Sequence, residues 1–321
     1  MIPYIDLHSD TITMMHCPFE NLERNRRMVN LKRMREGHTQ IQCFSAYVPT
    51  GYYPKAMREV LPWRMFCHIA NKKDWLLKKH ADRLFPVLSA KDLETCRGPE
   101  KTGLLFTIED AGVIGKSEKR LEEAWRRGVR IASLTWNHEN TLAFPNSRDA
   151  SVMKRGLKPF GTEMVEKMNE LGIVVDVSHL SDGGFWDVVK VSKKPFVATH
   201  SNSRELVGHP RNLTDEMIRA LAERGGVMGL NFASSFLSDD GKKESRIADM
   251  VRHVLHIRDV GGSGVLAIGS DFDGISGKLE IGSPREMPQL EEALKKAGLP
   301  ASEIEAMWQG NARRVLKEVW R

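Results

Sequence analysis

Short apolar runs of strand length recur along the chain, and longer amphipathic stretches lie between them. The runs are rich in Val, Ile and Leu and lack strict polar alternation, which is typical of parallel strands that are covered on both faces. Eight runs are expected to form strands: 2–8, 41–48, 103–109, 129–136, 173–179, 195–200, 226–232 and 265–271.

Three of the intervening stretches combine helical periodicity with signals for a start and a stop. The stretch 158–172 places its apolar residues on one face and ends at Gly172. The stretch 213–226 has Thr214 as an N-cap and ends in a glycine pair, and 117–128 repeats this form. All three are predicted to be helices.

Regular alternation of strand and helix predicts βα units. Eight units favour an α/β fold in which the strands close into a (β/α)8 (TIM) barrel, with residues 1–321 as a single domain. A doubly wound open sheet is the alternative, but no G-x-G-x-x-G motif follows the first run. The span 48–102 is expected to be a long loop that carries one or two helices.

Composition adds little to this picture. The 321 residues are 41% hydrophobic, and 48 basic against 42 acidic side chains give a net charge of +6. The basic stretches 23–35 and 71–80 also carry apolar residues at helical spacing, which favours the solvated faces of amphipathic helices over a nucleic-acid surface. We therefore expect no nucleic-acid partner.

The cysteine content and the N-terminal segment both favour a cytoplasmic protein. The four cysteines, Cys17, Cys43, Cys67 and Cys96, show no C-x-x-C spacing, and so few are not a disulfide scaffold. The charged "DLHSD" interrupts the first apolar run, unlike a signal peptide. No apolar run approaches the ~18–20 residues that span a bilayer, so no membrane partner is expected.

Residues that bind metals gather where the predicted strands end. In a (β/α)8 barrel the chemistry lies at these carboxyl ends, and His, Asp and Glu supply the N and O ligands of zinc and similar ions. His8 and Asp10 are two residues apart, so in extended chain both side chains point to the same side. The whole set predicts a metal site: His8, Asp10, Glu109, His138, His179, His200 and Asp271.

Other polar residues are assigned structural or solvated roles. Asp6 is expected to be a polar core residue or a partner of the ligands, and Asp176 and Asp273 are similar cases. Asp110 is expected at the surface. Six histidines among charges are expected to be solvated: His16, His38, His68, His80, His253 and His256.

Six motifs in this order, "DLHSDT", "TIED", "VSH", "THSN", "HPRN" and "GSDFDG", resemble those of the membrane (renal) dipeptidase family of zinc peptidases. The likeness runs from residue 2 to about 315, where it ends with "QGNARRVL". It implies a TIM barrel of the metal-dependent hydrolase type with a two-zinc centre, and it also implies a possible homodimer.

Each site residue takes its role from the motif that it matches. The resemblance makes His8 and Asp10 ligands of one zinc, Glu109 the carboxylate that bridges both ions, and His179 and His200 the ligands of the second zinc. It also implies three residues that contact the substrate: His138 near the scissile carbonyl, Arg211 as the residue that holds the substrate, and Asp271 near the substrate amine and the attacking water.

The chain departs from the mammalian members in three places. "EDAG" stands where they have a glycine pair after the bridging glutamate, which is expected to alter the loop without removing the ligand. Thr50 stands where a cysteine is expected, so the extracellular family disulfide cannot form. The protein is also expected to lack the secretory leader and the lipid-anchor tail of those members, which agrees with the expected cytoplasmic location.

The expected reaction is hydrolysis of dipeptides, including those with a C-terminal D-residue, by a hydroxide held between two ions. Asp271 would act as the base, His138 would stabilise the oxyanion, and the planar fork of Arg211 suits the C-terminal carboxylate. Zinc is the expected metal, although Mn²⁺ or Co²⁺ also suits such ligands. Three aromatic residues are candidates for the pocket wall or for simple packing: Tyr52, Tyr53 and Phe236.

One alternative to dipeptide hydrolysis remains open, and two others are disfavoured. The same two-metal site suits a hydrolase of N-acyl-D-amino acids or other amides, because these substrates also present a carboxylate to Arg211. The carboxylated lysine of many related barrels is disfavoured, since no lysine ends a predicted strand. A non-catalytic binding protein would have lost a ligand or an acid, and neither is lost; a nucleic-acid-binding protein rests on the basic charge alone.

Overall fold

The strands form a closed parallel barrel. The computed structural model describes residues 2–16, 19–95 and 101–320. Neighbouring strands follow the order β2-β1-β10-β8-β7-β6-β5-β4, and the pairing of β2 with β4 closes the ring. The eight strands are β1 (Tyr4–Asp6), β2 (Thr39–Tyr47), β4 (Thr102–Glu109), β5 (Val129–Ser133), β6 (Val174–Asp176), β7 (Val197–Ala198), β8 (Val227–Leu230) and β10 (Leu266–Ile268). Each of them overlaps one predicted run, so the predicted TIM barrel is confirmed.

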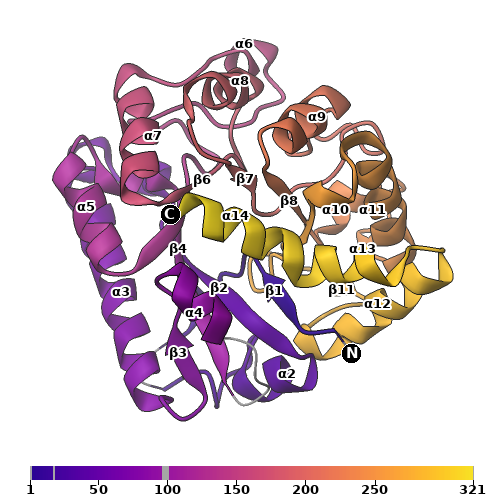
Figure 1. Ribbon diagram of the computed structural model, residues 1–321. Coiled ribbons are helices and arrows are strands. Elements are labelled where there is room, and N and C mark those ends of the chain that lie inside the picture. The colour runs from indigo at the N-terminus through magenta and orange to yellow at the C-terminus, as the bar shows by residue number, and fades with distance from the viewer. Residues whose placement is uncertain (1, 17–18, 96–100, 321) are drawn as a thin grey trace.

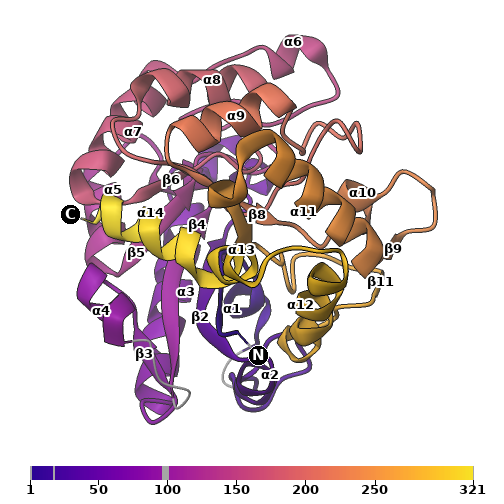
Figure 2. The ribbon, with the colours of Figure 1, turned by 45° about the vertical axis from the view of Figure 1, so that its right-hand side comes forward.

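Helices surround the barrel on its outside (Figures 1 and 2). Their bounds are α1 (Thr11–Met14), α2 (Leu31–Glu36), α3 (Leu61–Lys79), α4 (Ala90–Thr95), α5 (Glu118–Arg126), α6 (Ala150–Met153), α7 (Pro159–Leu171), α8 (Asp182–Val191), α9 (Asp215–Glu223), α10 (Ser234–Leu237), α11 (Ile247–Gly261), α12 (Met287–Lys296), α13 (Ala301–Glu305) and α14 (Asn311–Val319). The three helices expected from periodicity are α5, α7 and α9.

The end signals act as the sequence indicates at two of these helices. Gly172 follows α7 with φ 72°, a left-handed conformation that glycine adopts without steric cost. The Thr214 side chain accepts a hydrogen bond from the Met217 amide at the start of α9. Ser117 precedes α5 but makes no such side-chain bond.

The span 48–102 is more regular than expected. It contains α3 and α4, and also a strand that the sequence analysis missed, β3 (Leu84–Pro86), which pairs with the first residues of β4. A second small sheet joins β9 (Glu244–Ser245) to β11 (Lys278–Leu279), far apart in sequence. The strands β3, β9 and β11 are all too short to show a periodic pattern in the sequence.

Helix α14 covers the amino-terminal end of the barrel (Figure 1). Inward-pointing apolar side chains of all eight strands form one cluster, which includes Ile5, Leu105 and Val227. Four buried residues of α14 belong to the same cluster: Ala312, Val315, Leu316 and Val319. This end of the barrel is therefore filled with apolar side chains, and the opposite end is left for polar residues.

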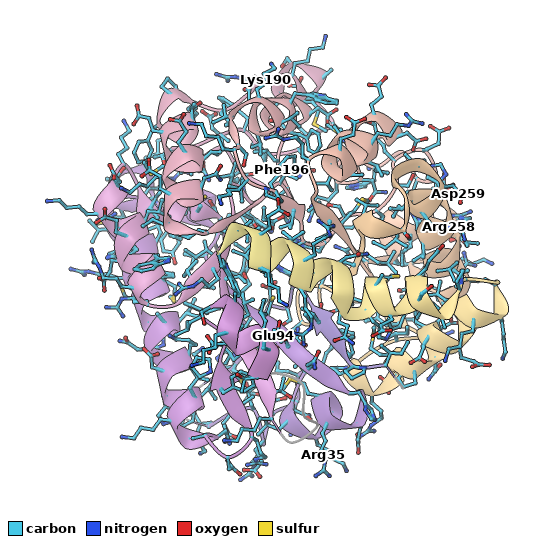
Figure 3. The ribbon with its side chains drawn as sticks, in the orientation of Figure 1. Arg35, Glu94, Lys190, Phe196, Arg258 and Asp259 are labelled. Carbon is cyan, nitrogen blue, oxygen red and sulfur yellow. The ribbon has the colours of Figure 1, made fainter. Side chains whose placement is uncertain are left out.

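Charged side chains such as Lys190 and Arg258 lie on the outer helices, while Phe196 is buried against Phe185 of α8, with ring centres 5.7 Å apart (Figure 3). Two histidines correct the sequence analysis: His80 and His253 are buried, not solvated. His253 is held there because its ring receives a hydrogen bond from the Ser203 amide and bonds the Leu237 carbonyl.

The other histidines in this group are closer to expectation. His16 and His68 are exposed, His38 is half-buried, and His256 is half-buried beside Asp215, at 2.7 Å. Cys43 and Cys67 are free thiols, and Cys17 and Cys96 lie outside the described residues. Among the described residues, no helix combines the length and apolar character that crossing a bilayer requires.

Replacing Leu316 by Ala is expected to lower the free energy of unfolding by about 2–5 kcal/mol, because it removes buried apolar volume where α14 fills the barrel end. Denaturant unfolding of the variant measures the loss. Glu318→Ala, an exposed position on the same helix, is the matched control and should change the free energy by less than about 0.5 kcal/mol. Equal stability of both variants would contradict the packing role of α14.

Candidate metal centre and active site

Glu109 lies at the centre of a cluster of buried ligands. It is the last residue of β4, and each of its carboxylate oxygens faces a different histidine. Glu109 Oε2 is 3.5 Å from His8 Nε2, which in turn is 3.6 Å from Asp10 Oδ1. Glu109 Oε1 is 2.9 Å from His179 Nε2 and 3.7 Å from His200 Nε2.

The five residues form two overlapping ligand groups that share Glu109. One group is His8, Asp10 and Glu109, and the other is Glu109, His179 and His200; in each, the ligand atoms lie within 4.8 Å of one another. A further group joins His8 and His200 to Asp271. The strand ends thus bring together all five residues that the sequence analysis assigned to metal.

The atoms of the first group fit a cation. His8 Nε2, Asp10 Oδ1 and Glu109 Oε2 are buried, and they have no hydrogen-bond partner among the described residues. Buried polar atoms are normally paired, and unpaired ones cost free energy. Nitrogen and carboxylate oxygen are the donors that zinc and similar divalent ions prefer.

Hydrogen bonds fix the tautomers of the second group. His179 Nδ1 lies 2.9 Å from the side-chain oxygen Asn137 Oδ1, to which it donates. His200 Nδ1 lies 2.7 Å from Thr199 Oγ1. The Thr199 hydroxyl donates its hydrogen bond to Asp176 at 2.7 Å, so Thr199 Oγ1 can only accept from His200, and His200 Nδ1 is also a donor.

Both histidines therefore present a lone pair at Nε2, and these two atoms are only 3.1 Å apart. Burial lowers the pKa of His179 and of His200 well below its ordinary value, so both rings are neutral. Two facing lone pairs repel each other, whereas a cation in contact with both would be bound by them. The second group fits a metal ion as well as the first does.

The charges of the cluster also favour a bound metal ion. Burial, followed by the charge of Asp10, raises the pKa of Glu109 to about 8. Burial disfavours the protonated form of His8, but the charges of Glu109 and Asp10 outweigh burial and raise the His8 pKa well above its ordinary value. A divalent cation would compensate the carboxylates in place of these protons.

Arg211 supplies a positive charge beside the cluster. It is 4% exposed, and its two terminal nitrogens donate to Ser201 Oγ at 2.8 Å and to the His200 carbonyl at 2.9 Å. Its Nε is buried without a hydrogen-bond partner, and no ion pair joins Arg211 to a carboxylate within the described part of the chain. Burial lowers its pKa to about 10, which leaves it charged at neutral pH. A buried guanidinium of this kind is suited to an anionic ligand.

Asp271 faces the ligands from the end of β10. Its backbone is left-handed, with φ 63°, and its Oδ1 lies 3.9 Å from His8 Nε2. Asn231 donates to Oδ2 at 3.0 Å, and burial raises the pKa of Asp271 to about 6. Gly274 packs against both carboxylates, since a Cβ there would lie 2.3 Å from Asp271 Oδ1 and 2.6 Å from Asp10 Oδ2.

His138 stands on the loop after β5, within an aromatic group. Its ring centre is 4.9 Å from Tyr52 and 5.7 Å from Trp136, and Trp136 also lies 6.3 Å from the His179 ring. His138 Nδ1 is buried and has no hydrogen-bond partner among the described residues. Packing alone therefore orients this ring.

The three aromatic candidates lie in different surroundings. Tyr52 is 67% exposed beside His138, and the Phe236 ring lies 5.7 Å from the Arg211 guanidinium, so both border the site. Tyr53 packs against the main hydrophobic core.

Some residues of the site were missed from sequence. They are Asn137, Trp136, Thr199 and Asn231, each of which lies beside a predicted ligand or orients one. Asp110 corrects an expectation, because it is fully buried and not at the surface. Two of them directly precede a predicted site residue, Thr199 before His200 and Asn137 before His138, and this adjacency is the signal that could have found them.

The comparisons with known proteins agree with this geometry. The family model of the membrane dipeptidases, peptidase family M19, matches residues 1–321. An uncharacterized protein in the pqqA 5′ region of Klebsiella pneumoniae is 36% identical over 253 residues, which are 76% of this chain and 92% of that protein. The dipeptidase tcpJ of Claviceps purpurea is 28% identical over 301 residues, 91% of this chain and 69% of that protein.

A solved structure gives the same result. A metallopeptidase from Rhodobacter sphaeroides, crystallised with a phosphinate mimic of the dipeptide L-Ala-D-Ala, superimposes with a TM-score of 0.88 at 26% identity and covers 99% of both chains. The barrel, the buried ligand groups and the match over the whole sequence identify this chain as a metallo-dipeptidase that belongs to the membrane dipeptidase family, peptidase family M19.

Proposed function

We propose that this dipeptidase uses two zinc ions bridged by Glu109 and that it accepts dipeptides with a C-terminal D-residue. The observation that carries the proposal is the position of Glu109, whose two oxygens face separate ligand groups. His8 and Asp10 would hold one ion, and His179 and His200 the other. Mn²⁺ or Co²⁺ would suit the same nitrogen and oxygen donors.

When bound, two such ions activate a water molecule and polarise the scissile carbonyl. The protein's own residues carry out the proton transfers. Asp271 lies beside the ligands, where it accepts the proton that the attacking water loses. It then delivers this proton to the leaving amine as the peptide C–N bond breaks. The hydrogen bond from Asn231 orients its carboxylate for both steps.

His138 is proposed to stabilise the oxyanion that develops on the carbonyl oxygen. Its packing against Tyr52 and Trp136 holds the ring in one orientation before the substrate binds. Preorganised donors of this kind stabilise the transition state because they need no rearrangement during the reaction.

Arg211 is proposed to bind the C-terminal carboxylate of the dipeptide. The Nε atom of this buried side chain has no hydrogen-bond partner, and its guanidinium makes no ion pair within 4 Å with a carboxylate of the described residues. Recognition of the carboxylate leaves the side chain of the C-terminal residue unconstrained, which suits both L- and D-residues. The bound L-Ala-D-Ala mimic in the Rhodobacter sphaeroides relative supports this part of the proposal.

A hydrolase of N-acyl-D-amino acids is the second candidate. Arg211 favours it equally, since an N-acyl amino acid offers the same carboxylate. Asp271 favours the dipeptide, because its carboxylate can also pair with a free substrate amine near the ligands. Turnover of N-acetyl-D-alanine faster than of Ala-D-Ala would favour the second candidate.

Chelation is expected to remove about two ions per chain and to lower the melting temperature, because the buried carboxylates then repel each other. At about 100 times the dissociation constant, a bound ion stabilises the fold by about 2.7 kcal/mol. Elemental analysis and thermal unfolding before and after chelation, with zinc added back, measure both effects. One ion per chain would contradict the bridging role of Glu109.

Arg211→Lys is expected to raise KM for Ala-L-Ala and Ala-D-Ala at least about tenfold, because lysine keeps the charge but loses the planar fork. The matched control is the substrate: the C-terminal amides of both dipeptides lack the carboxylate, so their kcat/KM should hardly change. An equal loss for acids and amides would exclude the carboxylate as the ligand of Arg211.

Asp271→Asn is expected to lower kcat by at least about 100-fold while the metal content stays at the wild-type value, since an amide cannot accept the proton. Steady-state kinetics and elemental analysis of the same sample measure the two effects separately. Wild-type turnover would exclude Asp271 as the base, and loss of metal would make it a ligand instead.

A further inference from the structure

Asp110 is buried next to the metal centre, but the proposed reaction does not use it. It follows Glu109, it is 0% exposed, and its backbone is left-handed with φ 72°. No ion pair joins its carboxylate to a cation among the described residues. A buried carboxylate in a strained backbone conformation needs compensating contacts.

Hydrogen bonds from three different loops supply this compensation. Asp110 Oδ2 accepts from the Thr50 amide at 2.8 Å and from the Thr50 hydroxyl at 2.7 Å. Asp110 Oδ1 accepts from Asn140 Nδ2 at 2.8 Å and from the Gly112 amide at 3.1 Å. We call Asp110, Thr50, Gly112 and Asn140 the Asp110 network; it joins the loops that follow β2, β4 and β5.

The network is tightly packed around Gly112. A Cβ at this position would lie 2.7 Å from Asp110 Oδ1, 2.8 Å from Asn140 Cβ and 2.9 Å from Thr50 Oγ1. A side chain at Gly112 would therefore clash with the other three members of the network, so only glycine fits at this position.

Two of the joined loops together hold His138. Gly51, directly after Thr50, packs on the imidazole so closely that a Cβ would lie 2.3 Å from His138 Cγ. Tyr52 packs on the ring from the same loop. On the other loop, Asn140 closes the turn after His138, since it donates to the Leu134 carbonyl and accepts from the Ala143 amide.

We infer that Asp110 is a positioning residue that acts on the reaction through His138. His138 Nδ1 has no hydrogen-bond partner among the described residues, so the ring depends on contacts with these two loops for its orientation. Asp110 fastens both loops to the strand that carries Glu109, and it thereby sets the place of the imidazole relative to the metal ligands. The inference rests on the proposed role of His138.

Asp110→Asn tests this role. All four hydrogen bonds of the network are donated to the Asp110 carboxylate, so the amide NH2 of asparagine would face other donors and could not accept their bonds. We expect kcat to fall about 10- to 100-fold, the range for a catalytic group displaced by about 1 Å. KM should change less than about threefold, and the metal content should stay at the wild-type value. Thr50→Val removes the hydroxyl hydrogen bond to Asp110 and keeps the bond from the Thr50 amide, so kcat should fall by a smaller factor. This variant tests the inference if Asp110→Asn does not fold.

A double-mutant cycle with His138→Ala separates positioning from a general effect on the fold. If Asp110 acts through His138, Asp110→Asn should lower kcat less than twofold further in the His138→Ala background. Asp273→Asn is the matched control, since Asp273 is another left-handed aspartate (φ 66°), half-buried, that accepts hydrogen bonds from the Thr11 hydroxyl and from the Met28 amide. Its effect should be the same in both backgrounds.

The possible failures are distinguishable. If His138→Ala keeps wild-type kcat, the proposed role of His138 is wrong, and the inference falls with it. If His138→Ala is impaired and Asp110→Asn lowers kcat by the same factor in both backgrounds, the proposed function stands and the inference about Asp110 is overturned.

Discussion

The carboxylate of Glu109 is the group on which the arrangement of the site depends. It is buried within 4 Å of three histidines, and only bound cations or protons can compensate its charge there. Its position is fixed by backbone pairing, because β4 pairs with β2 from Ile41 opposite Gly103 to Tyr47 opposite Glu109. The longest parallel pairing in the barrel thus ends at the centre of the ligand cluster.

The residues that contact the ligands carry the same constraint outward. Asp176 accepts a hydrogen bond from the Thr199 hydroxyl, and Thr199 Oγ1 accepts one from His200 Nδ1. These two bonds fix the tautomer and the orientation of the His200 imidazole. Hydrogen-bond partners of this kind fix the tautomer and the ring orientation of histidines that bind metal. The barrel strands set the positions of the ligands, and the hydrogen-bond partners determine which ring nitrogen of each histidine carries the proton.

The sequence predicted the eight barrel strands because parallel strands covered on both faces are continuous apolar runs. It placed the end of β4 correctly at Glu109 but most other ends too late: 173–179 holds a strand of only Val174–Asp176. It also predicted the ligands, whose chemistry and strand-end positions coincide. The same pattern could not reveal β3, which is only Leu84–Pro86.

The wrong predictions concern residues whose partners are distant in sequence. Asp110 looked solvated beside Glu109, but Thr50 and Asn140, 60 and 30 residues away, bury it. His253 looked like one of many polar residues on a helix, but it meets Ser203 and Leu237 from other elements. Local periodicity does not contain these contacts, because tertiary packing alone creates them.

The apolar closure of the barrel by α14 has a consequence for the order of events during synthesis. Asp6 in β1 pairs with Ile268 in β10, and the core beneath them is complete only with residues 312–319 of α14. These residues leave the ribosome after all eight strands. A nascent chain can therefore form local βα units early, but its barrel stays open at the base, with apolar side chains exposed to chaperones, until this last helix is released.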